Sequence, residues 1–287
     1  MIKIDEKEPE GYEWYKEQIA GHHPSVIKGN QKQIGLLKKK NGKNVLKVVQ
    51  DGIKGELEVQ FYDTLFNQEV PKSFNILKSF VPEYFGLHDI KFSDKTFKFI
   101  ELADIAEVYK YPCQMDVKIG IKTFDPHASK KKQENESKKY PPQSTLGFRI
   151  LGYRLNLIDS TDKNNTSLIV KDRVWGRSFN ENNVLYAFKE FFIHNSSYLN
   201  TYLLEDFLKQ LKTLESWFNV QTSYHFYASS LLFVYEGNAT VKEELKPTIK
   251  MIDFSHTYCG NDQLDKNYIP GLKNLIEIFE KCLNFYK

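Results

Sequence analysis

Two charged side chains with a strict spacing give the first indication of chemistry in this sequence. Asp116 and Lys118 occur in the segment PCQMDVKIG, where they alternate with Met115, Val117 and Ile119. If the segment is a strand, the apolar side chains point into a core, and the carboxylate and ammonium point together the other way. Such a pair can contact a sugar hydroxyl and a phosphate at once. The alternative is an ordinary ion pair on a half-exposed strand.

A lysine inside an apolar strand is the second candidate. In NVLKVV, Val45, Lys47 and Val49 share one face of the predicted strand. The next segment, GELEVQFYDTLF, has apolar residues four apart and predicts a helix that can bring Glu58 to Lys47. Protein-kinase-like folds use a strand lysine and a helix glutamate in this way to hold ATP phosphates. An ordinary ion pair is again the alternative.

A lysine-rich segment, DPHASKKKQENESKKYPP, follows the central strand. As a short helix it places Lys132 and Lys139 on one face, because seven residues make two turns. Opposite Lys118 across a cleft, these lysines would form a pocket for several phosphates. Glu136 on the same face favours the alternative, a solvated loop, since a carboxylate repels phosphate.

The segment TIKMIDFSHT predicts a strand that ends at Asp253. An acidic residue after a buried run, followed by an aromatic and a small residue, is similar to the metal-holding Asp-Phe-Gly segment of protein kinases. Magnesium prefers hard oxygen ligands and takes few of them from the protein. The alternatives are an aspartate that ends a strand and, for His256, a surface histidine.

The elements that must position these side chains fall into two groups. Ile34–Val49 predicts a β-hairpin whose Asn41-Gly42 dipeptide favours a type I′ turn. A further strand, KTFKFIEL, ends at Leu102, and ADIAEVYKYPC then reads as a connector between two lobes. Beyond it we expect a strand pair in LIDSTDKNNTSLIV, and neighbouring strands in SSLLFVYEG and TIKMIDFSHT. Helices are predicted in NNVLYAFKEFF, YLLEDFLKQLKTLESWF and DKNYIPGLKNLIEIFEKCL.

Composition limits the class of protein. The chain has 287 residues, enough for one large domain or two closely packed ones, and 41% are hydrophobic, so a sizeable core can form. The net charge is only +3, from 40 Lys and Arg against 37 Asp and Glu. Attraction to polyanions must therefore come from local clusters, and a protein that coats nucleic acid is disfavoured.

The cysteines and the hydropathy of the sequence indicate the cellular compartment. Cys113, Cys259 and Cys282 lack metal-binding spacing and disfavour a disulfide framework, which predicts a reducing compartment. MIKIDEKEPEG has no apolar signal core, and no apolar run approaches the roughly 18–20 residues that span a membrane. We expect a monomer in the cytosol or nucleus with neither a membrane nor a nucleic acid as partner.

Two common nucleotide-binding motifs are absent from the sequence. Without G-x-x-x-x-G-K-[ST] a P-loop is excluded, and without G-x-G-x-x-G a Rossmann fold is disfavoured.

The order of these motifs points to a family. PCQMDVKIG, followed by SSLL and IDFSHT, resembles the inositol polyphosphate kinase family, whose hallmark is P-x-x-x-D-x-K-x-G. The resemblance runs from QIAGH at residues 18–22 to residues 267–272 and covers most of the chain. It implies a two-lobed, protein-kinase-like α+β fold. The N-lobe would span residues 1–105 and the C-lobe residues 106–287, with an inositol-phosphate-binding helical segment at 121–142.

The resemblance also implies an activity, the transfer of the γ-phosphoryl group of ATP to an inositol polyphosphate with Mg²⁺. The shortness of the lysine-rich segment is similar to the hexakisphosphate-kinase and multikinase branches and unlike the trisphosphate 3-kinases. Of these two branches we favour a hexakisphosphate kinase, which forms a pyrophosphate on the ring. A multikinase that phosphorylates hydroxyls of the tris- and tetrakisphosphates is the alternative. A non-catalytic inositol-phosphate sensor is a rival of another class. A kinase for choline or another small alcohol is disfavoured, because no H-x-D-x-x-x-x-N occurs.

For the nucleotide, the resemblance implies that Lys47 contacts ATP phosphates and that Glu58 orients it. Ala103, Asp104 and Ile105 are the ATP-binding candidates of the connector, where Ala103 and Ile105 match positions whose main chain binds the adenine edge. Relatives often have Glu where Ala103 stands, but a main-chain contact should survive that change.

For catalysis and the acceptor, the resemblance assigns Asp116 to the ATP ribose or to the role of a base. Lys118 would bridge the transferred phosphoryl group and the inositol phosphate, and Asp253 would hold magnesium. Lys132, Lys139 and His256 match substrate-binding positions of the family. Ser229 and Ser230 of the SSLL segment would line the strand next to the one that ends at Asp253.

Overall fold

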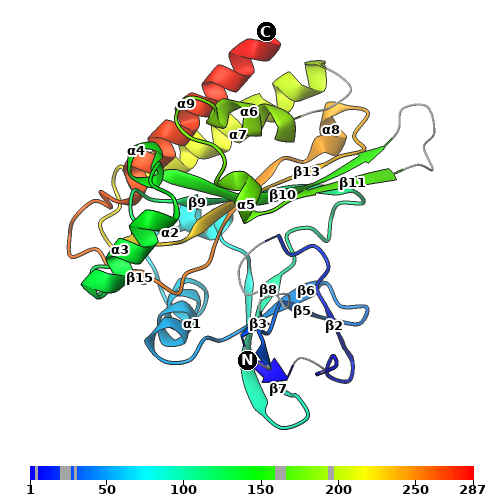
Figure 1. Ribbon diagram of the computed structural model, residues 1–287, viewed down its shortest axis with the longest axis vertical. Coiled ribbons are helices and arrows are strands. Elements are labelled where there is room, and N and C mark those ends of the chain that lie inside the picture. The colour runs from blue at the N-terminus through cyan, green and yellow to red at the C-terminus, as the bar shows by residue number, and fades with distance from the viewer. Residues whose placement is uncertain (4–5, 20–26, 29–30, 159–165, 193–196) are drawn as a thin grey trace.

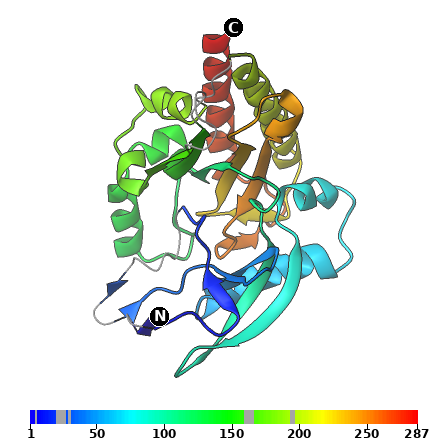
Figure 2. The ribbon, with the colours of Figure 1, turned by 90° about the vertical axis from the view of Figure 1, so that its right-hand side faces the viewer.

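Two five-stranded sheets lie on either side of a connector, residues 104–111, in the computed structural model of the protein (Figure 1). The structure describes residues 1–3, 6–19, 27–28, 31–158, 166–192 and 197–287. Most of the QIAGH segment, residues 20–22, lies outside these ranges. A view turned by 90° separates the two sheets, with the helices of the second sheet stacked on its far side (Figure 2).

The first sheet is antiparallel and has the strand order β2-β5-β6-β8-β7. Its strands are β2 (Tyr12–Trp14), β5 (Leu37–Lys39), β6 (Asn44–Val48), β7 (Tyr84–Lys91) and β8 (Thr96–Ala103). A small sheet beside the N-terminus pairs β1 (Ile2–Lys3), β4 (Gln31–Lys32) and β3 (Ile27–Lys28).

The predicted hairpin is present as β5 and β6, but its turn differs from the expected type. Gly42 N donates to Lys39 O at 2.8 Å, so Lys40 and Asn41 are the central residues of the turn. Asn41 has a φ of 63°, whereas Gly42 does not adopt a positive φ. A type I′ turn needs a positive φ at both central residues. The expected Asn41-Gly42 type I′ turn is therefore wrong, and the turn lies one residue earlier.

Helix α1 (Ile53–Asn67) packs on the first sheet at β7, whereas α2 (Phe74–Phe80) packs against α1 and elements of the second lobe. The spacing of four predicted α1, and its Phe61 and Leu65 are buried in one core with Val45 of β6. Leu46, the next residue of β6, faces the other way into a second apolar cluster. The two faces of β6 thus follow the period of a strand, as predicted. Helix α2 and strand β7 were not predicted.

The second sheet, with order β11-β10-β9-β13-β14, is also antiparallel. Its strands are β9 (Pro112–Ile119), β10 (Phe148–Ile158), β11 (Thr166–Lys171), β13 (Ser230–Glu236) and β14 (Thr248–Ile252). A separate pair joins β12 (Tyr224–Phe226) to β15 (Thr257–Cys259). The central strand β9 buries Met115, Val117 and Ile119 completely, which confirms the alternation predicted for it.

Helices cover the face of the second sheet that is turned away from the first (Figure 1). Apolar side chains of α7, including the predicted Leu204, Leu208, Leu211, Leu214 and Trp217, are buried there, and α7 packs against α9. The helices after the connector are α3 (Lys130–Lys139), α4 (Gln143–Leu146), α5 (Arg173–Gly176), α6 (Val184–Phe191), α7 (Ser197–Phe218), α8 (Lys242–Leu245) and α9 (Tyr268–Tyr286).

Two glycines let α9 approach the central sheet. A Cβ on Gly271 would lie 1.9 Å from the carbonyl oxygen of Gly147, so no other residue fits there. That same oxygen accepts a hydrogen bond from Gly120 N at 2.7 Å, directly after β9. The helix is thereby held close to the end of the strand that carries Asp116 and Lys118.

Other expectations concern membranes and disulfides. None of the helices in the described part of the chain combines the length and apolarity of a membrane span. Cys113, Cys259 and Cys282 are free thiols.

Candidate functional site

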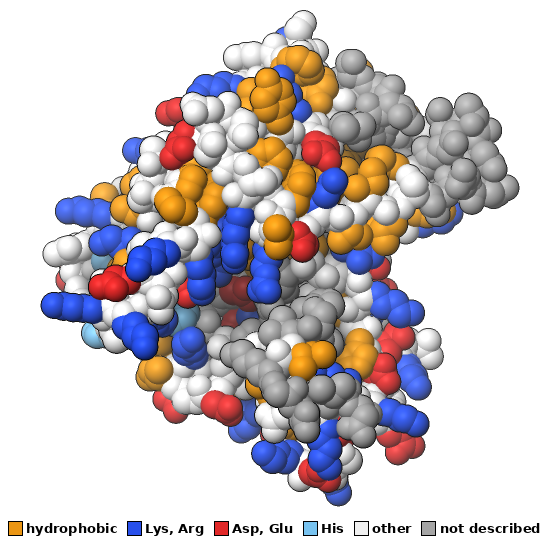
Figure 3. All heavy atoms as spheres, in the orientation of Figure 1, with side chains coloured by type: hydrophobic (Ala, Val, Ile, Leu, Met, Phe, Trp, Pro, Cys, Tyr) orange, Lys and Arg blue, Asp and Glu red, His pale blue; other side chains and the backbone are white. Residues whose placement is uncertain are grey.

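A cavity of about 360 Å³ opens between the two sheets. Its walls come from the segment after β2, from β6, the connector, β9, α3 and the chain after β14. In Figure 3, Lys and Arg side chains gather along the upper edge of the hollow between the lobes. The cavity therefore joins a mixed, partly apolar end at the connector to a basic end at α3.

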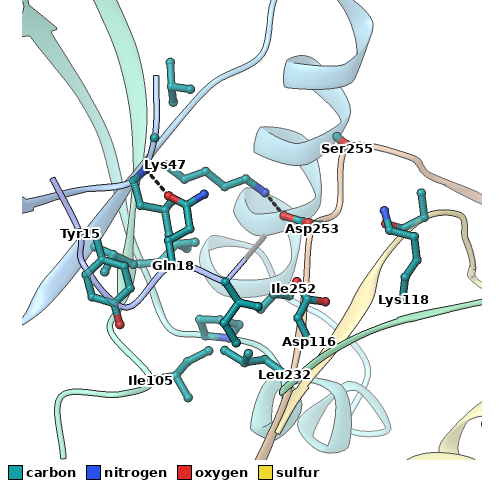
Figure 4. Close-up of a pocket in the computed structure, with 18 of the residues that line it drawn as sticks. Tyr15, Gln18, Lys47, Ile105, Asp116, Lys118, Leu232, Ile252, Asp253 and Ser255 are labelled. Carbon is teal, nitrogen blue, oxygen red and sulfur yellow. Dashed lines mark hydrogen bonds and ion pairs between the residues drawn. The ribbon is translucent and has the colours of Figure 1, made fainter. Parts of the chain in front are cut away.

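Lys47 is the hub of a charged cluster in this cavity. Its Nζ donates to Glu58 Oε1 at 2.7 Å. It also donates to Asp253 Oδ1 at 2.5 Å, the contact marked in Figure 4. The Glu58 side chain has no exposed surface, while Asp253 keeps 31% of its side-chain surface exposed. Burial alone would lower the pKa of Lys47, but the charges of Asp253 and Glu58 outweigh burial and raise it. Lys47 is therefore a permanent cation.

The segment after β14 is anchored to helix α1 by both backbone and side chains. Glu58 Oε1 also accepts a hydrogen bond from Phe254 N at 3.0 Å. The Phe254 ring stacks on Phe61 with centroids 4.0 Å apart. Asp253, between these contacts and β14, has a φ of 67°, a conformation that aspartate tolerates better than most residues. Its carboxylate is thus fixed at the cavity wall, where a hard cation could use it as a ligand.

Asp116 and Lys118 face the cavity from the same side of β9, as the period of two predicted. Burial, followed by the charge of Asp253, raises the pKa of Asp116 to about 7. Asp116 Oδ1 has no hydrogen-bond partner among the described residues. Burial lowers the pKa of Lys118, whose Nζ donates to Ala228 O at 2.9 Å. Both side chains are therefore desolvated groups beside each other.

Strand β13 supplies the small residues beside this pair. Ser230 is paired with Lys118 on one side and Ile252 on the other, and it is fully buried. Ser229 is also buried, next to it in sequence. Ser230 therefore begins β13 beside Lys118, and Ser229 lies directly before the strand, where its carbonyl oxygen accepts a hydrogen bond from Ile119 N at 3.0 Å.

The connector presents main chain to the cavity. Ala103, Asp104 and Ile105 all line it. Ala103 N already donates to Glu83 O at 2.9 Å, so a ligand contact of Ala103 must use its carbonyl oxygen. The Asp104 side chain is engaged elsewhere, because Oδ1 accepts from Tyr15 Oη at 2.7 Å and from Ala106 N at 2.9 Å.

Lys38 also donates to Asp104, to its Oδ2 at 2.8 Å. We call the contacts of Tyr15 and Lys38 with this carboxylate the clamp on Asp104. The carboxylate therefore ties both the segment after β2 and the β5 strand to the connector. This arrangement identifies Asp104 as a residue that shapes the connector and leaves direct contacts to the neighbouring main chain.

At the basic end, Lys132 and His256 converge on Asp125. Asp125 Oδ2 lies 3.2 Å from Lys132 Nζ and 3.0 Å from His256 Nδ1. Burial and the positive charge of Lys54 lower the pKa of His256 to about 4, so His256 is neutral near pH 7. Burial would raise the pKa of Asp125, but the hydrogen bond from Lys132, the charge of Lys132 and smaller neighbouring effects together outweigh burial and lower the pKa.

The two predicted lysines of α3 have different surroundings. Lys132 lines the cavity together with Glu136, whereas Lys139 is more exposed and forms an ion pair with Glu136. The predicted helix is confirmed with the bounds Lys130–Lys139. Ser129 caps it, since Ser129 Oγ accepts a hydrogen bond from Lys132 N at 3.3 Å. A carboxylate therefore stands among the lysines of the basic end.

Sequence reasoning missed Arg149 of β10. It pairs across the sheet with Lys118, is 6% exposed, and its Nε has no partner in the described part of the chain. Burial, followed by the charge of Arg177, lowers the pKa of Arg149. A signal was present, because in Phe148–Ile150 this arginine alternates with two buried apolar residues just as Lys47 does in β6. Arg149 adds a second buried cation beside Lys118.

A comparison with protein-family models shows the family of the chain. Residues 99–280, more than half of the chain, match the model described as inositol polyphosphate kinase. The chain belongs to the inositol polyphosphate kinase family. The match includes the connector, β9, α3, β14 and Asp253, while Lys47 and Glu58 precede it in sequence.

Individual members of the inositol polyphosphate kinase family are similar over much of the chain. Human inositol polyphosphate multikinase is 31% identical over 223 residues, which is 77% of this chain and 50% of the human protein. The chain therefore aligns with about half the length of that relative. The Arabidopsis thaliana multikinase alpha is 29% identical over 93% of this chain and 94% of its own length. Human inositol hexakisphosphate kinase 3 is 32% identical over 65% of this chain and 52% of its own length.

Solved structures of the family share the fold. The Saccharomyces cerevisiae multikinase Ipk2, solved with ADP and Mn²⁺, superposes with a TM-score of 0.68 at 24% identity and covers 84% of this chain. A second inositol phosphate multikinase structure gives a TM-score of 0.62 at 26% identity over 78% of this chain. The two-lobed, kinase-like α+β fold expected from the motifs is confirmed.

Proposed function

We propose that the protein is an ATP-dependent inositol polyphosphate kinase of the multikinase type, which phosphorylates ring hydroxyls of inositol tris- and tetrakisphosphates. The observation that carries the proposal is the continuity of the cavity. It runs from the connector, past Lys47 and Asp253, to Lys118 and then to Lys132. A nucleotide at one end and a small polyanion at the other would meet at Lys118.

The nucleotide end supports ATP as the phosphoryl donor. The Ala103 carbonyl and the main chain of Ile105 offer hydrogen bonds to a base edge, and Leu102 and Leu232 line the cavity with apolar surface. Lys47 is a permanent cation at the far side of this space. A flat base against apolar walls with phosphates at a fixed lysine is how kinase-like folds place ATP. The yeast relative, which was solved with ADP and Mn²⁺, supports the same use here.

Phosphoryl transfer needs positioning and charge neutralisation more than covalent chemistry. Lys47 would hold the phosphates of the donor, and Lys118 would lie between donor and acceptor. Asp253 offers a carboxylate oxygen at the cavity wall, which fits one ligand of a magnesium ion. Magnesium, when bound with ATP, supplies further positive charge on the phosphates. Positive side chains that are already desolvated and fixed stabilise charge more strongly than solvated ones.

The acceptor end supports the multikinase reading over a hexakisphosphate kinase. Glu136 lines the cavity near Lys118 and Arg149. Its negative charge partly opposes the lowering of the pKa of both cations by burial. A carboxylate accepts a hydrogen bond from a ring hydroxyl but repels a phosphate. A partly phosphorylated inositol therefore fits this wall better than a hexakisphosphate. The multikinase relatives, which align over more of the chain than the hexakisphosphate kinase does, support the same choice.

A substrate panel tests the proposal. The purified protein is incubated with radiolabelled MgATP and, separately, with inositol tris-, tetrakis-, pentakis- and hexakisphosphates, and the products are separated. We expect the tris- and tetrakisphosphates to be the better acceptors. Turnover of the hexakisphosphate alone would instead identify a hexakisphosphate kinase. Binding of inositol phosphates without any transfer would identify a sensor.

A further inference from the structure

Gln114 is a buried polar residue whose amide nitrogen has no hydrogen bond to the described part of the chain. It is 3% exposed, lines the cavity, and its Nε2 has no hydrogen-bond partner among the residues that the structure describes. Buried amides are nearly always hydrogen-bonded, because an unpaired one loses its contacts with water without replacement. A buried, unpaired donor at a cavity wall is therefore placed to meet a ligand.

The position of Gln114 along β9 indicates which part of a ligand it would meet. Gln114, Asp116 and Lys118 are alternate residues of one strand and face the same cavity. Successive members of this row are about 6.6 Å apart, since a strand rises about 3.3 Å per residue. Strand β9 begins directly after the connector, so Gln114 lies at the connector end and Lys118 at the phosphate end. Asp116 lies between them.

The two residues at the connector end of this row have complementary chemistry. Asp116 Oδ1 also has no partner in the described ranges, and it is an acceptor when the carboxyl group is ionised. Gln114 Nε2 is a donor. On the β13 side, the cross-strand neighbour of Asp116 is Leu232 and that of Gln114 is Val234, both apolar. On the β10 side, Asp116 is opposite Gly152, and Gln114 is opposite Arg154, whose guanidinium is paired with Glu17. A donor and an acceptor that are neighbours on one cavity wall match two adjacent hydroxyl groups.

We propose that Gln114 donates a hydrogen bond to one ribose hydroxyl of the bound nucleotide, beside the hydroxyl that the family resemblance assigns to Asp116. The inference rests on the nucleotide site of the proposed function. The ribose carries the vicinal hydroxyl pair of an adenine nucleotide, whereas the base presents its edge to the connector. An inositol ring also carries adjacent hydroxyls, but it would lie at the Lys132 end of the cavity. Gln114 and Asp116 together would thus make the protein discriminate against nucleotides that lack either ribose hydroxyl.

The test compares the binding of MgADP, 2′-deoxy-ADP and 3′-deoxy-ADP by isothermal titration calorimetry. We expect the unaltered protein to bind both deoxynucleotides more weakly than ADP. Gln114→Met keeps the length of the side chain and removes its hydrogen bonds. We expect it to bind ADP about 3–10-fold more weakly, the range that one net hydrogen bond supplies. It should also lose discrimination against one deoxynucleotide and keep it against the other.

Controls separate this role from packing and from the proposed function. Gln68→Met makes the same change at an exposed site after α1 and should bind all three nucleotides like the unaltered protein. Equal weakening of all three nucleotides by Gln114→Met, or none, would overturn the inference. If ribose discrimination depends on Gln114 but no inositol phosphate is phosphorylated, the proposed function fails and the inference stands. If phosphorylation proceeds and Gln114→Met leaves discrimination intact, the inference alone fails.

Discussion

Lys47 and Asp253 form a direct ion pair, with Nζ 2.5 Å from Oδ1, although 206 residues separate them in sequence. The cation expected at the ATP phosphates and the carboxylate expected at the metal thus neutralise each other. Phosphates and a metal ion would compete for these two partners. Binding MgATP would therefore exchange one set of ionic contacts for another, which keeps the net gain in affinity moderate.

We predict that Lys47→Met both inactivates and destabilises the protein. Glu58 has no exposed surface, so removing the ammonium leaves a buried carboxylate without its cation. Breaking such a pair costs about 3–5 kcal/mol of unfolding free energy, measured by urea denaturation. Phosphoryl transfer should fall by at least about 100-fold, because a fixed positive charge at the phosphates is lost.

Two variants sharpen this prediction. Lys40→Met, at the exposed hairpin turn, should leave stability and activity unchanged. The double variant Lys47→Met with Glu58→Gln should recover most of the stability, since no buried charge remains, but not the activity. A Lys47→Met protein that transfers phosphate at the normal rate would contradict the role of Lys47.

Asp253→Asn should abolish turnover while the protein stays folded. Asparagine tolerates the φ of 67° at this position, so the backbone needs no adjustment. The loss of a hard anionic ligand should slow transfer by at least about 100-fold. Asp262→Asn is the matched control, because Asp262 is exposed and has a φ of 58°. Rates with radiolabelled ATP and thermal unfolding curves decide the outcome, and full activity of Asp253→Asn is the contrary result.

Asp116 should make the unliganded protein less stable as the pH rises from about 4 to about 7. The pKa of this carboxyl is raised from 3.8 to about 7 in the folded state. Between these values the folded protein holds a proton that the unfolded chain has released, so raising the pH favours unfolding. The contribution is present below about pH 4, is lost on passing pH 7, and is constant above it.

The measurement is the unfolding free energy of the unaltered protein minus that of Asp116→Asn at each pH, in which the other titrating groups largely cancel. This difference should fall by roughly 2–4 kcal/mol between pH 4 and pH 7. A flat difference across this range would show that Asp116 ionises normally. Asp253→Asn should reduce the fall, because the charge of Asp253 is the second cause of the raised pKa.

Glu136→Gln should improve the use of the hexakisphosphate. The substitution removes a negative charge from the cavity wall and keeps the shape of the side chain. We expect the KM for the hexakisphosphate to fall by about 5–10-fold, with a smaller change for the trisphosphate. Glu134→Gln on the exposed side of the same helix is the control. An unchanged ratio of the two KM values would exclude Glu136 from substrate selection.

Much of the site could be predicted because its residues follow local periods. Side chains of a strand alternate between its two faces, which predicted that Asp116 and Lys118 share one face of β9. The same alternation showed that Lys47 is a charged residue on an apolar face of β6. The period of α1 placed Glu58 in reach of Lys47. Each of these predictions needs only the geometry of one element and its neighbour in sequence.

The rest depended on contacts that no local period encodes. The clamp on Asp104 joins Tyr15 and Lys38 to the connector across 89 and 66 residues. Arg149 matters because β10 pairs with β9, and strand order is a property of the whole sheet. The hairpin turn was misjudged because Asn tolerates a positive φ by itself, so the dipeptide did not fix which residues are central.

Lys47 Nζ and Phe254 N both donate to Glu58 Oε1, although they come from distant parts of the sequence. This distance matters while the chain is being synthesised. Lys47 leaves the ribosome 206 residues ahead of Asp253, a delay of roughly 10–40 s at ordinary rates of translation. During that interval Lys47 and Glu58 lack their contacts with Asp253 and Phe254. The cluster at the proposed nucleotide site is therefore completed only late in synthesis.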